Sequence, residues 1–156
     1  MLTAHPSTGI KTVADLIKVA KDKPGTLNYS SGGIGNFSHM GLELLANQTG
    51  IKIVHVPYRG GAPSVTDLVA GNIQLLISNL PECIGQIRGG RLRALAVTGP
   101  QRHAQLPDVP TVREAGMPEV VGGIVGRSPA IRRVHDRIAR AAPAALPVLV
   151  TGASGT

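Results

Sequence analysis

The sequence predicts an α/β fold built around a mainly parallel sheet, and three observations support this class. Short apolar runs alternate with segments of helical periodicity. The runs Ile73–Ile77 and Leu92–Thr98 are almost wholly apolar, which is typical of parallel strands that are covered on both faces. Each follows a helical segment that ends in glycine, so SVTDLVAGNIQLLIS and ECIGQIRGGRLRALAVT share one helix–strand pattern. This alternation implies helices that pack against a mainly parallel sheet.

Capping and turn residues define the other elements. Thr12 and Asp15 have the spacing of a capping box, and Pro24-Gly25 ends the helix that follows them. Thr111 and Glu114 have the same spacing and predict a short helix. That helix is expected to end at Gly116. Two more strands are expected at Leu27–Ser30 and Lys52–Val56, and the helices that follow them are expected to end at Gly50 and Gly71. A short helix is expected at Pro81–Ile87.

The chain changes character after Pro118. Residues 120–125 are rich in Val and Gly, a basic helix is predicted after Ser128-Pro129, and a strand is predicted at Pro147–Thr151. We therefore predict a domain boundary near 119–123, which divides the chain into a main domain at 1–119 and a short α/β tail at 120–156.

Charge and composition exclude several classes of function. The net charge is +7, but the tail alone carries 5 Arg against 1 Asp, and a solvated helix face explains this excess. Aromatic residues make up 2% of the chain and no base-reading motif is present, so no nucleic-acid partner is expected. The single cysteine, Cys83, lies in an apolar context and is predicted to be buried. The five histidines lack the spacing of a metal site, and no metal is expected.

The stretch Leu27–His39 is predicted to form a strand, a glycine-rich turn and the start of a helix. This geometry brings unpaired backbone N–H groups and the positive end of a helix dipole to one point, which attracts a phosphate or a carboxylate. Gly33-Ile34-Gly35 with Ser38 nearly matches the dinucleotide fingerprint, but Ser38 replaces the third glycine. The strand after it offers His55 and Val56 and no acidic residue for a ribose hydroxyl, which weakens the nucleotide hypothesis.

The same turn has a purely structural interpretation and a catalytic one. The glycines are also explained if they only allow the chain to turn. Ser38-His39 is not predicted to be a nucleophile and its base, because adjacent helix residues point in different directions and no acidic orienting residue is evident. No catalytic residue is therefore expected.

Capture of a carboxylate by backbone and hydroxyl groups fits the turn better than these alternatives. Serine hydroxyls, glycine N–H groups and a helix N-terminus hold an anion without a buried cation. A second turn, Tyr58–Ala62, follows the next strand and is expected to face the same cleft. The predicted ligand-binding residues are Ser30, Ser31, Gly32, Gly33, Gly35, Asn36, Ser38, His39 and Tyr58.

Five motifs occur in order along residues 6–118 and resemble those of one family. They are Y-x-S-x-G-x-G-x-x-x-H, HVPY-[KR]-G-x-x-P, DL-x-x-G, LRALAVT and LPDVPT-x-x-E-x-G. This part of the chain resembles the Bug family, the extracytoplasmic solute receptors of tripartite tricarboxylate transporters. The resemblance implies a periplasmic-binding-protein fold in which two α/β lobes close on a small di- or tricarboxylate, and this chain resembles the second lobe alone.

The resemblance also implies a cellular role. It implies a periplasmic receptor with membrane permease subunits as partners, no catalysis and no cofactor. It implies that the turn from Ser30 to His39 is one of two loops that hold a ligand carboxylate. The N-terminal residues MLTAHPSTG have neither the basic nor the apolar region of a signal peptide. The sequence as given is therefore also compatible with the cytoplasm.

The tail resembles a different family. IVGRSPAIRRVHDRIARAAPAALPVLVTGASGT is similar to the start of the AAA+ domain of sigma-54-dependent transcriptional regulators. Its last residues, Gly152, Ser154, Gly155 and Thr156, match the first half of a Walker A loop, without the lysine that reaches the phosphates. A solute-binding lobe is the favoured function. A fragment of such a regulator is the first alternative, and a nucleotide-binding enzyme is the second.

Overall fold

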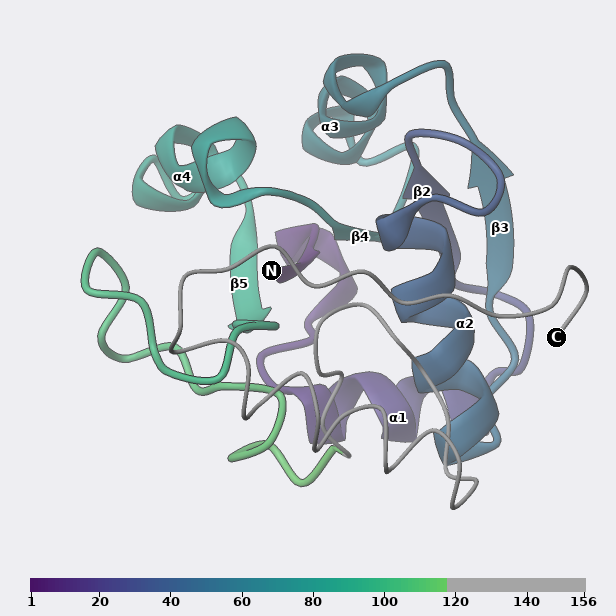
Figure 1. The fold of residues 1–156 in the computed structure, drawn as a ribbon. Coiled ribbons are helices and arrows are strands. Elements are labelled where there is room, and N and C mark those ends of the chain that lie inside the picture. Colours follow the sequence, from purple (N-terminus) through teal and green to yellow (C-terminus); the bar gives the residue numbers. More distant parts are fainter. Residues whose placement is uncertain (118–156) are drawn as a thin grey trace, which may run out of the picture. The chain divides into compact units, whose positions relative to one another are not determined.

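The computed structural model describes residues 1–117. Five strands and four α-helices alternate along these residues, with a short 3-10 helix near the start (Figure 1). In chain order they are β1 (Leu2–Ala4), η1 (Pro6–Thr8), α1 (Val13–Asp22), β2 (Asn28–Ser31), α2 (Phe37–Thr49), β3 (Val54–Pro57), α3 (Gly61–Ala70), β4 (Leu75–Ile77), α4 (Leu80–Arg88) and β5 (Arg93–Ala96).

The strands form one sheet in the order β3-β2-β4-β1-β5. β2 pairs in parallel with both β3 and β4, whereas β1 lies antiparallel between β4 and β5. Four of the five strands therefore run in the same direction, which confirms the predicted α/β class with a mainly parallel sheet. The sequence did not predict β1, because its three residues are too few to show a period.

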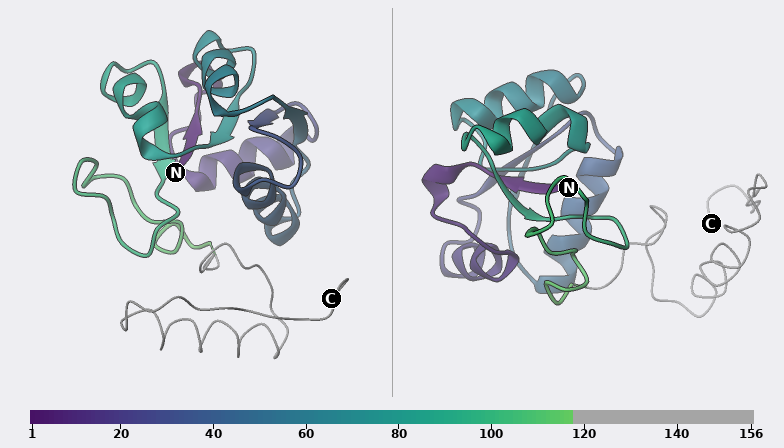
Figure 2. Two further views of the ribbon diagram at one scale, coloured as in Figure 1. Left: turned by 45° about the horizontal axis from the view of Figure 1, so that its top comes forward. Right: turned by 90° about the vertical axis from the view of Figure 1, so that its left-hand side faces the viewer.

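Helices cover both faces of the sheet, as Figure 2 shows. One apolar cluster joins the sheet to α1 and α2 through Leu16, Leu42 and Leu75, and the other joins it to α3 and α4 through Leu68 and Leu76. Leu75 and Leu76 are adjacent on β4 and point to opposite faces, as the alternation of a strand requires. Cys83 is fully buried in the second cluster, as predicted.

Both predicted capping boxes form, but only the one at Thr12 begins a helix. The predicted box at Thr12 and Asp15 is present and begins α1. At Thr111 the box also forms, because the backbone N–H of Thr111 donates to Glu114 Oε2 at 2.8 Å and that of Glu114 donates to Thr111 Oγ1 at 3.1 Å. The predicted helix is nevertheless wrong. The segment contains only turns, and it reaches a left-handed residue, Gly116 with φ +81°, before a helix is established.

Other predictions differ from the structure by a residue or two or cannot be compared with it. The strands expected at Leu27–Ser30 and Lys52–Val56 lie at Asn28–Ser31 and Val54–Pro57. The tail predicted at 120–156 and its incomplete Walker A loop lie outside the described residues, so the boundary near 119–123 stays a prediction. Within residues 1–117, no helix has the length and apolar content needed to cross a bilayer.

Candidate functional site

Three helices begin at the same edge of the sheet. β2, β3 and β4 are neighbours that run in parallel, and each is followed by a turn and then by α2, α3 or α4. Their carboxyl ends therefore bring three helix N-termini together, each with N–H groups that have no partner within the helix. In open α/β sheets this edge is where ligands bind.

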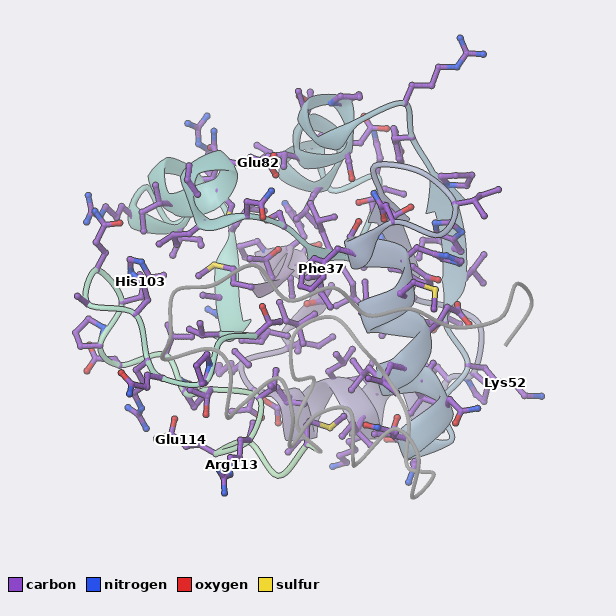
Figure 3. The ribbon with its side chains drawn as sticks, viewed as in Figure 1. Phe37, Lys52, Glu82, His103, Arg113 and Glu114 are labelled. Carbon is purple, nitrogen blue, oxygen red and sulfur yellow. The ribbon has the colours of Figure 1, made fainter. Side chains whose placement is uncertain are left out.

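An open cavity of about 240 Å³ lies between these helix starts. Leu76 and Ile77 of β4 and the ring of Phe37 supply its apolar surface. Figure 3 shows Phe37 at the start of α2 and Glu82 at the start of α4, two residues that line the cavity from different helices. The polar lining residues are Gly32, Asn36, Ser38, Gly61, Ser64, Ser78, Asn79 and Glu82.

The start of α2 is capped by the side chain of Asn36. Asn36 Oδ1 accepts from the backbone N–H of His39 at 3.0 Å and from the Ser38 hydroxyl at 2.9 Å. The Ser38 hydroxyl in turn accepts weakly, at 3.4 Å, from the N–H of Gly32. These bonds fix the glycine turn against the first turn of the helix.

Gly32 also allows close contact between the glycine turn before α2 and the second turn, Tyr58–Ala62. A Cβ at this position would lie 2.9 Å from Asn36 Nδ2 and 3.2 Å from the backbone carbon of Gly60. The N–H of Gly60 donates to the Gly32 carbonyl at 3.1 Å, and that of Tyr58 donates to the Ser31 carbonyl at 2.9 Å. The second turn therefore lies directly beside the first, and its residue Gly61 lines the cavity.

The starts of α3 and α4 differ from that of α2. Neither N-cap residue, Gly60 or Asn79, makes a side-chain capping bond. Ser64, in the first turn of α3, is fully buried, and its hydroxyl has no hydrogen-bond partner among residues 1–117. A buried hydroxyl without a partner is costly, so a ligand that supplies one is favoured there.

A stack of rings lies beneath the glycine turn. The rings of His39 and His55 are 4.1 Å apart, and the ring of Tyr29 is 4.8 Å from that of His55. His39 Nδ1 accepts from the N–H of Gly35 at 3.0 Å, and His55 Nε2 lies 2.6 Å from the Ser31 hydroxyl. Burial, followed by the neighbouring His39, lowers the pKa of His55. The stack therefore supports the turn through ring contacts and through these two hydrogen bonds.

The structure separates the predicted site residues into groups. Gly32, Asn36 and Ser38 line the cavity. Ser31, Gly33, Gly35 and His39 shape the turn through the bonds described above and through a bond from the Ser31 hydroxyl to the Gly33 carbonyl. Ser30 is fully buried, and its hydroxyl has no partner among residues 1–117, while the Tyr58 hydroxyl donates to Asp67 Oδ2 on α3.

Sequence reasoning missed the contribution of α3 and α4. Ser64, Ser78, Asn79 and Glu82 all line the cavity, and none was among the predicted residues, whereas Gly61 lies in the second turn, Tyr58–Ala62, which was expected to face the same cleft. A signal was present, because Pro63 and Pro81 mark first helical turns immediately after β3 and β4. Applying the rule that ligands bind at the carboxyl ends of all three strands would have found them.

The fold, with helix starts gathered at one edge of a mainly parallel sheet, is typical of ligand-binding α/β domains. The model of the family described as "Tripartite tricarboxylate transporter family receptor" matches residues 1–130. The chain belongs to this family, as the resemblance to Bug proteins predicted. The matched range passes the predicted boundary near 119–123, and nothing in these matches bears on the AAA+ resemblance of the tail.

Curated relatives and a solved structure agree with this assignment. The chain is 40% identical over 119 residues to a UPF0065 protein of Pseudomonas sp. encoded between tcbD and tcbE, covering 76% of this chain and 35% of the relative. It is 36% identical over 121 residues to protein BugT of Bordetella pertussis, covering 78% of this chain and 37% of that protein. A Rhodopseudomonas palustris protein solved with adipate has a TM-score of 0.74 and 33% identity, covering 90% of this chain and 50% of that one. The chain thus spans between about a third and a half of the proteins that it matches.

Proposed function

We propose that this chain supplies one lobe of a carboxylate receptor and that the cavity at the starts of α2, α3 and α4 captures a carboxylate group of the ligand. The observation that carries the proposal is the convergence of three helix N-termini on a cavity in which the buried Ser64 hydroxyl has no partner. The relative solved with adipate supports a small dicarboxylate as the class of ligand.

The captured group is held by dipoles rather than by a cation. None of the described residues that line the cavity is Lys, Arg or His. Backbone N–H groups at the uncapped starts of α3 and α4, together with the Ser64 hydroxyl, are the donors for the anion. Each helix terminus stabilises an anion by about 0.3–1 kcal/mol, so one lobe alone binds weakly.

The complete receptor acts by binding and release. We propose that it lies in the periplasm, closes a second lobe over the ligand and delivers it to the permease subunits of a tripartite transporter, without catalysis and without a cofactor. The family description supports this role. Residues 120–156 take no part in the proposal, and their resemblance to a sigma-54-dependent AAA+ domain stays a sequence prediction.

An NMR titration of the ¹⁵N-labelled 156-residue chain with adipate tests the proposal. We expect a dissociation constant in the millimolar range, since one lobe offers only part of the contacts. Amide shifts should concentrate at Gly32, Gly61, Ser64 and Asn79, which line the cavity. The neutral analogue 1,6-hexanediol should leave these amides unchanged. Equal shifts with adipate and the diol, or no cavity shift at tens of millimolar adipate, would contradict the proposal.

A further inference from the structure

Glu82 is an acidic residue within a cavity that otherwise suits an anion. It is the only ionisable residue among the described residues that line the cavity. It lies in the first turn of α4, and Figure 3 shows its side chain between α4 and α3. A Cβ placed on Gly61, the first residue of α3, would lie 3.0 Å from Glu82 Oε1 and 3.2 Å from Oε2. The carboxylate of Glu82 therefore lies against the start of α3.

No basic side chain neutralises this carboxylate. Within residues 1–117, the interactions of the Glu82 side chain with other polar groups are electrostatic only, and it forms neither an ion pair with Lys, Arg or His nor a side-chain hydrogen bond. The α-amino group of Met1 is close enough for Glu82 to oppose the effect of burial, which lowers the pKa of that amine. This amine already donates to the Ser78 carbonyl and belongs to a buried residue.

A second carboxylate beside Glu82 is unfavourable. Two carboxylates that share one site cannot both stay ionised without repulsion. The hydrogen-bond donors of the cavity favour an anionic group. Glu82 favours a positively charged group close to that anionic group. A ligand that carries both groups satisfies the two demands together, and its ammonium supplies the positive charge that no described Lys, Arg or His side chain places in the cavity.

We propose that Glu82 determines the ligand class and selects carboxylates that carry an ammonium group next to the captured carboxylate. The inference rests on the proposed function, because it takes the captured group to be a carboxylate. The uncapped helix starts and Ser64 hold the carboxylate, and Glu82 accepts hydrogen bonds from the ammonium. Glu82 thus acts as the residue that discriminates an amino acid from the dicarboxylate of the same length.

Matched ligand pairs test the proposal on the 156-residue chain. Succinate and aspartate have the same four-carbon skeleton and differ by one ammonium group, as do glutarate and glutamate with five carbons. NMR titrations should show at least one amino acid binding about tenfold more tightly than its unsubstituted partner, which is the effect of a single good charged contact. The substitution Glu82→Gln keeps the shape of the side chain and should abolish most of this preference. It should also strengthen binding of the unsubstituted dicarboxylate.

The control variant is Asp22→Asn, which makes the same change of charge at an exposed residue of α1 outside the cavity. It should leave the preference unchanged. Equal affinities within both ligand pairs in the natural chain, or a preference that survives Glu82→Gln, would overturn the inference while leaving carboxylate capture intact. If no carboxylate shifts the cavity amides at all, the proposed function itself fails.

Discussion

The start of α2 and the starts of α3 and α4 face the same cavity but are built in different ways. At α2, the Asn36 side chain accepts from the N–H of His39 and from the Ser38 hydroxyl, which itself accepts from the N–H of Gly32 in the preceding turn. At α3 and α4 the N-cap residues Gly60 and Asn79 make no side-chain capping bond, and the Ser64 hydroxyl has no partner within the described part of the chain. One helix start carries a side-chain cap, and the other two carry none, which the proposed function explains as donors kept for a ligand.

This difference assigns separate tasks to the two regions. The glycine turn before α2 is held by caps, by contact with Gly60 and by the stacked rings of Tyr29, His39 and His55. A rigid, satisfied turn fixes the shape of the cavity and limits the entropy lost on binding. Under the proposed function, the uncapped helix starts provide donors whose bonds are made only when the anion is present. Substitutions in the first region should therefore affect stability, and substitutions in the second should affect binding.

Gly32→Ala is expected to have the largest effect. The new methyl group would lie 2.9 Å from Asn36 Nδ2 and 3.2 Å from the backbone of Gly60, and backbone cannot move aside as a side chain can. We expect a loss of about 1–3 kcal/mol in the free energy of unfolding, measured by urea denaturation. Binding of adipate should weaken as well, because the cavity loses its shape.

Gly85→Ala is the matched control for this substitution. Gly85 lies within α4, and a Cβ there would have no atom within 4 Å. Alanine is the better helix former, so this variant should be more stable by about 0.5–1 kcal/mol. If both glycine variants shift stability by the same amount and in the same direction, close approach of the two turns is not what Gly32 provides.

Asn36→Ala and Asn79→Ala compare the two kinds of helix start directly. Asn36 caps α2 through its side chain, so its removal should cost about 1 kcal/mol of unfolding free energy. Asn79 makes no capping bond, and its removal should change stability by less than about 0.5 kcal/mol. Urea denaturation of the two variants measures both values. Equal costs at the two positions would remove the distinction between a satisfied and an open helix start.

Much of this arrangement was predictable from the sequence, and particular residues show where prediction stopped. The capping box at Thr12 and the glycine that ends each of α2 and α3 are local signals, so those elements lie close to their expected bounds. β1 exists only because Leu2–Ala4 pairs with β4 and β5, residues more than 70 positions away, and a local pattern carries no record of such pairing.

Only the part of the site that lies on the glycine turn was predicted, for the same reason. The glycine turn is contiguous, so the sequence showed Gly32, Asn36 and Ser38 together. Ser64 and Glu82 reach the cavity only through the parallel order of β2, β3 and β4, which is a tertiary fact. The helix predicted after Thr111 is absent for a related reason. The capping box forms, but the left-handed Gly116 follows within a single turn and no helix continues.

Ser64→Ala should separate binding from stability. Its hydroxyl is buried without a partner, so removing it should leave the free energy of unfolding unchanged or raise it by about 0.5 kcal/mol. Binding of adipate should weaken by roughly threefold to tenfold, because one hydrogen bond to a charged group is lost. Thermal unfolding and the NMR titration measure the two effects. A variant that binds adipate as the natural chain does would show that Ser64 is not a donor to the anion.

The smallest expected effect is a pH dependence of the free energy of unfolding that originates at His55, in the ring stack beside the glycine turn. Burial and the neighbouring His39 lower the pKa of His55 from its ordinary value of 6.5, while Glu43 acts against this shift. Below about pH 6.5 the unfolded chain therefore binds more protons than the folded chain, and stability falls as the pH falls through this range. Thermal unfolding between about pH 7.5 and about pH 5.5 should show this loss, and His55→Gln should reduce its slope. His103→Gln, at an exposed histidine outside the stack, should keep the slope of the natural chain. If His55→Gln keeps that slope too, the stacked histidines do not set the pH response.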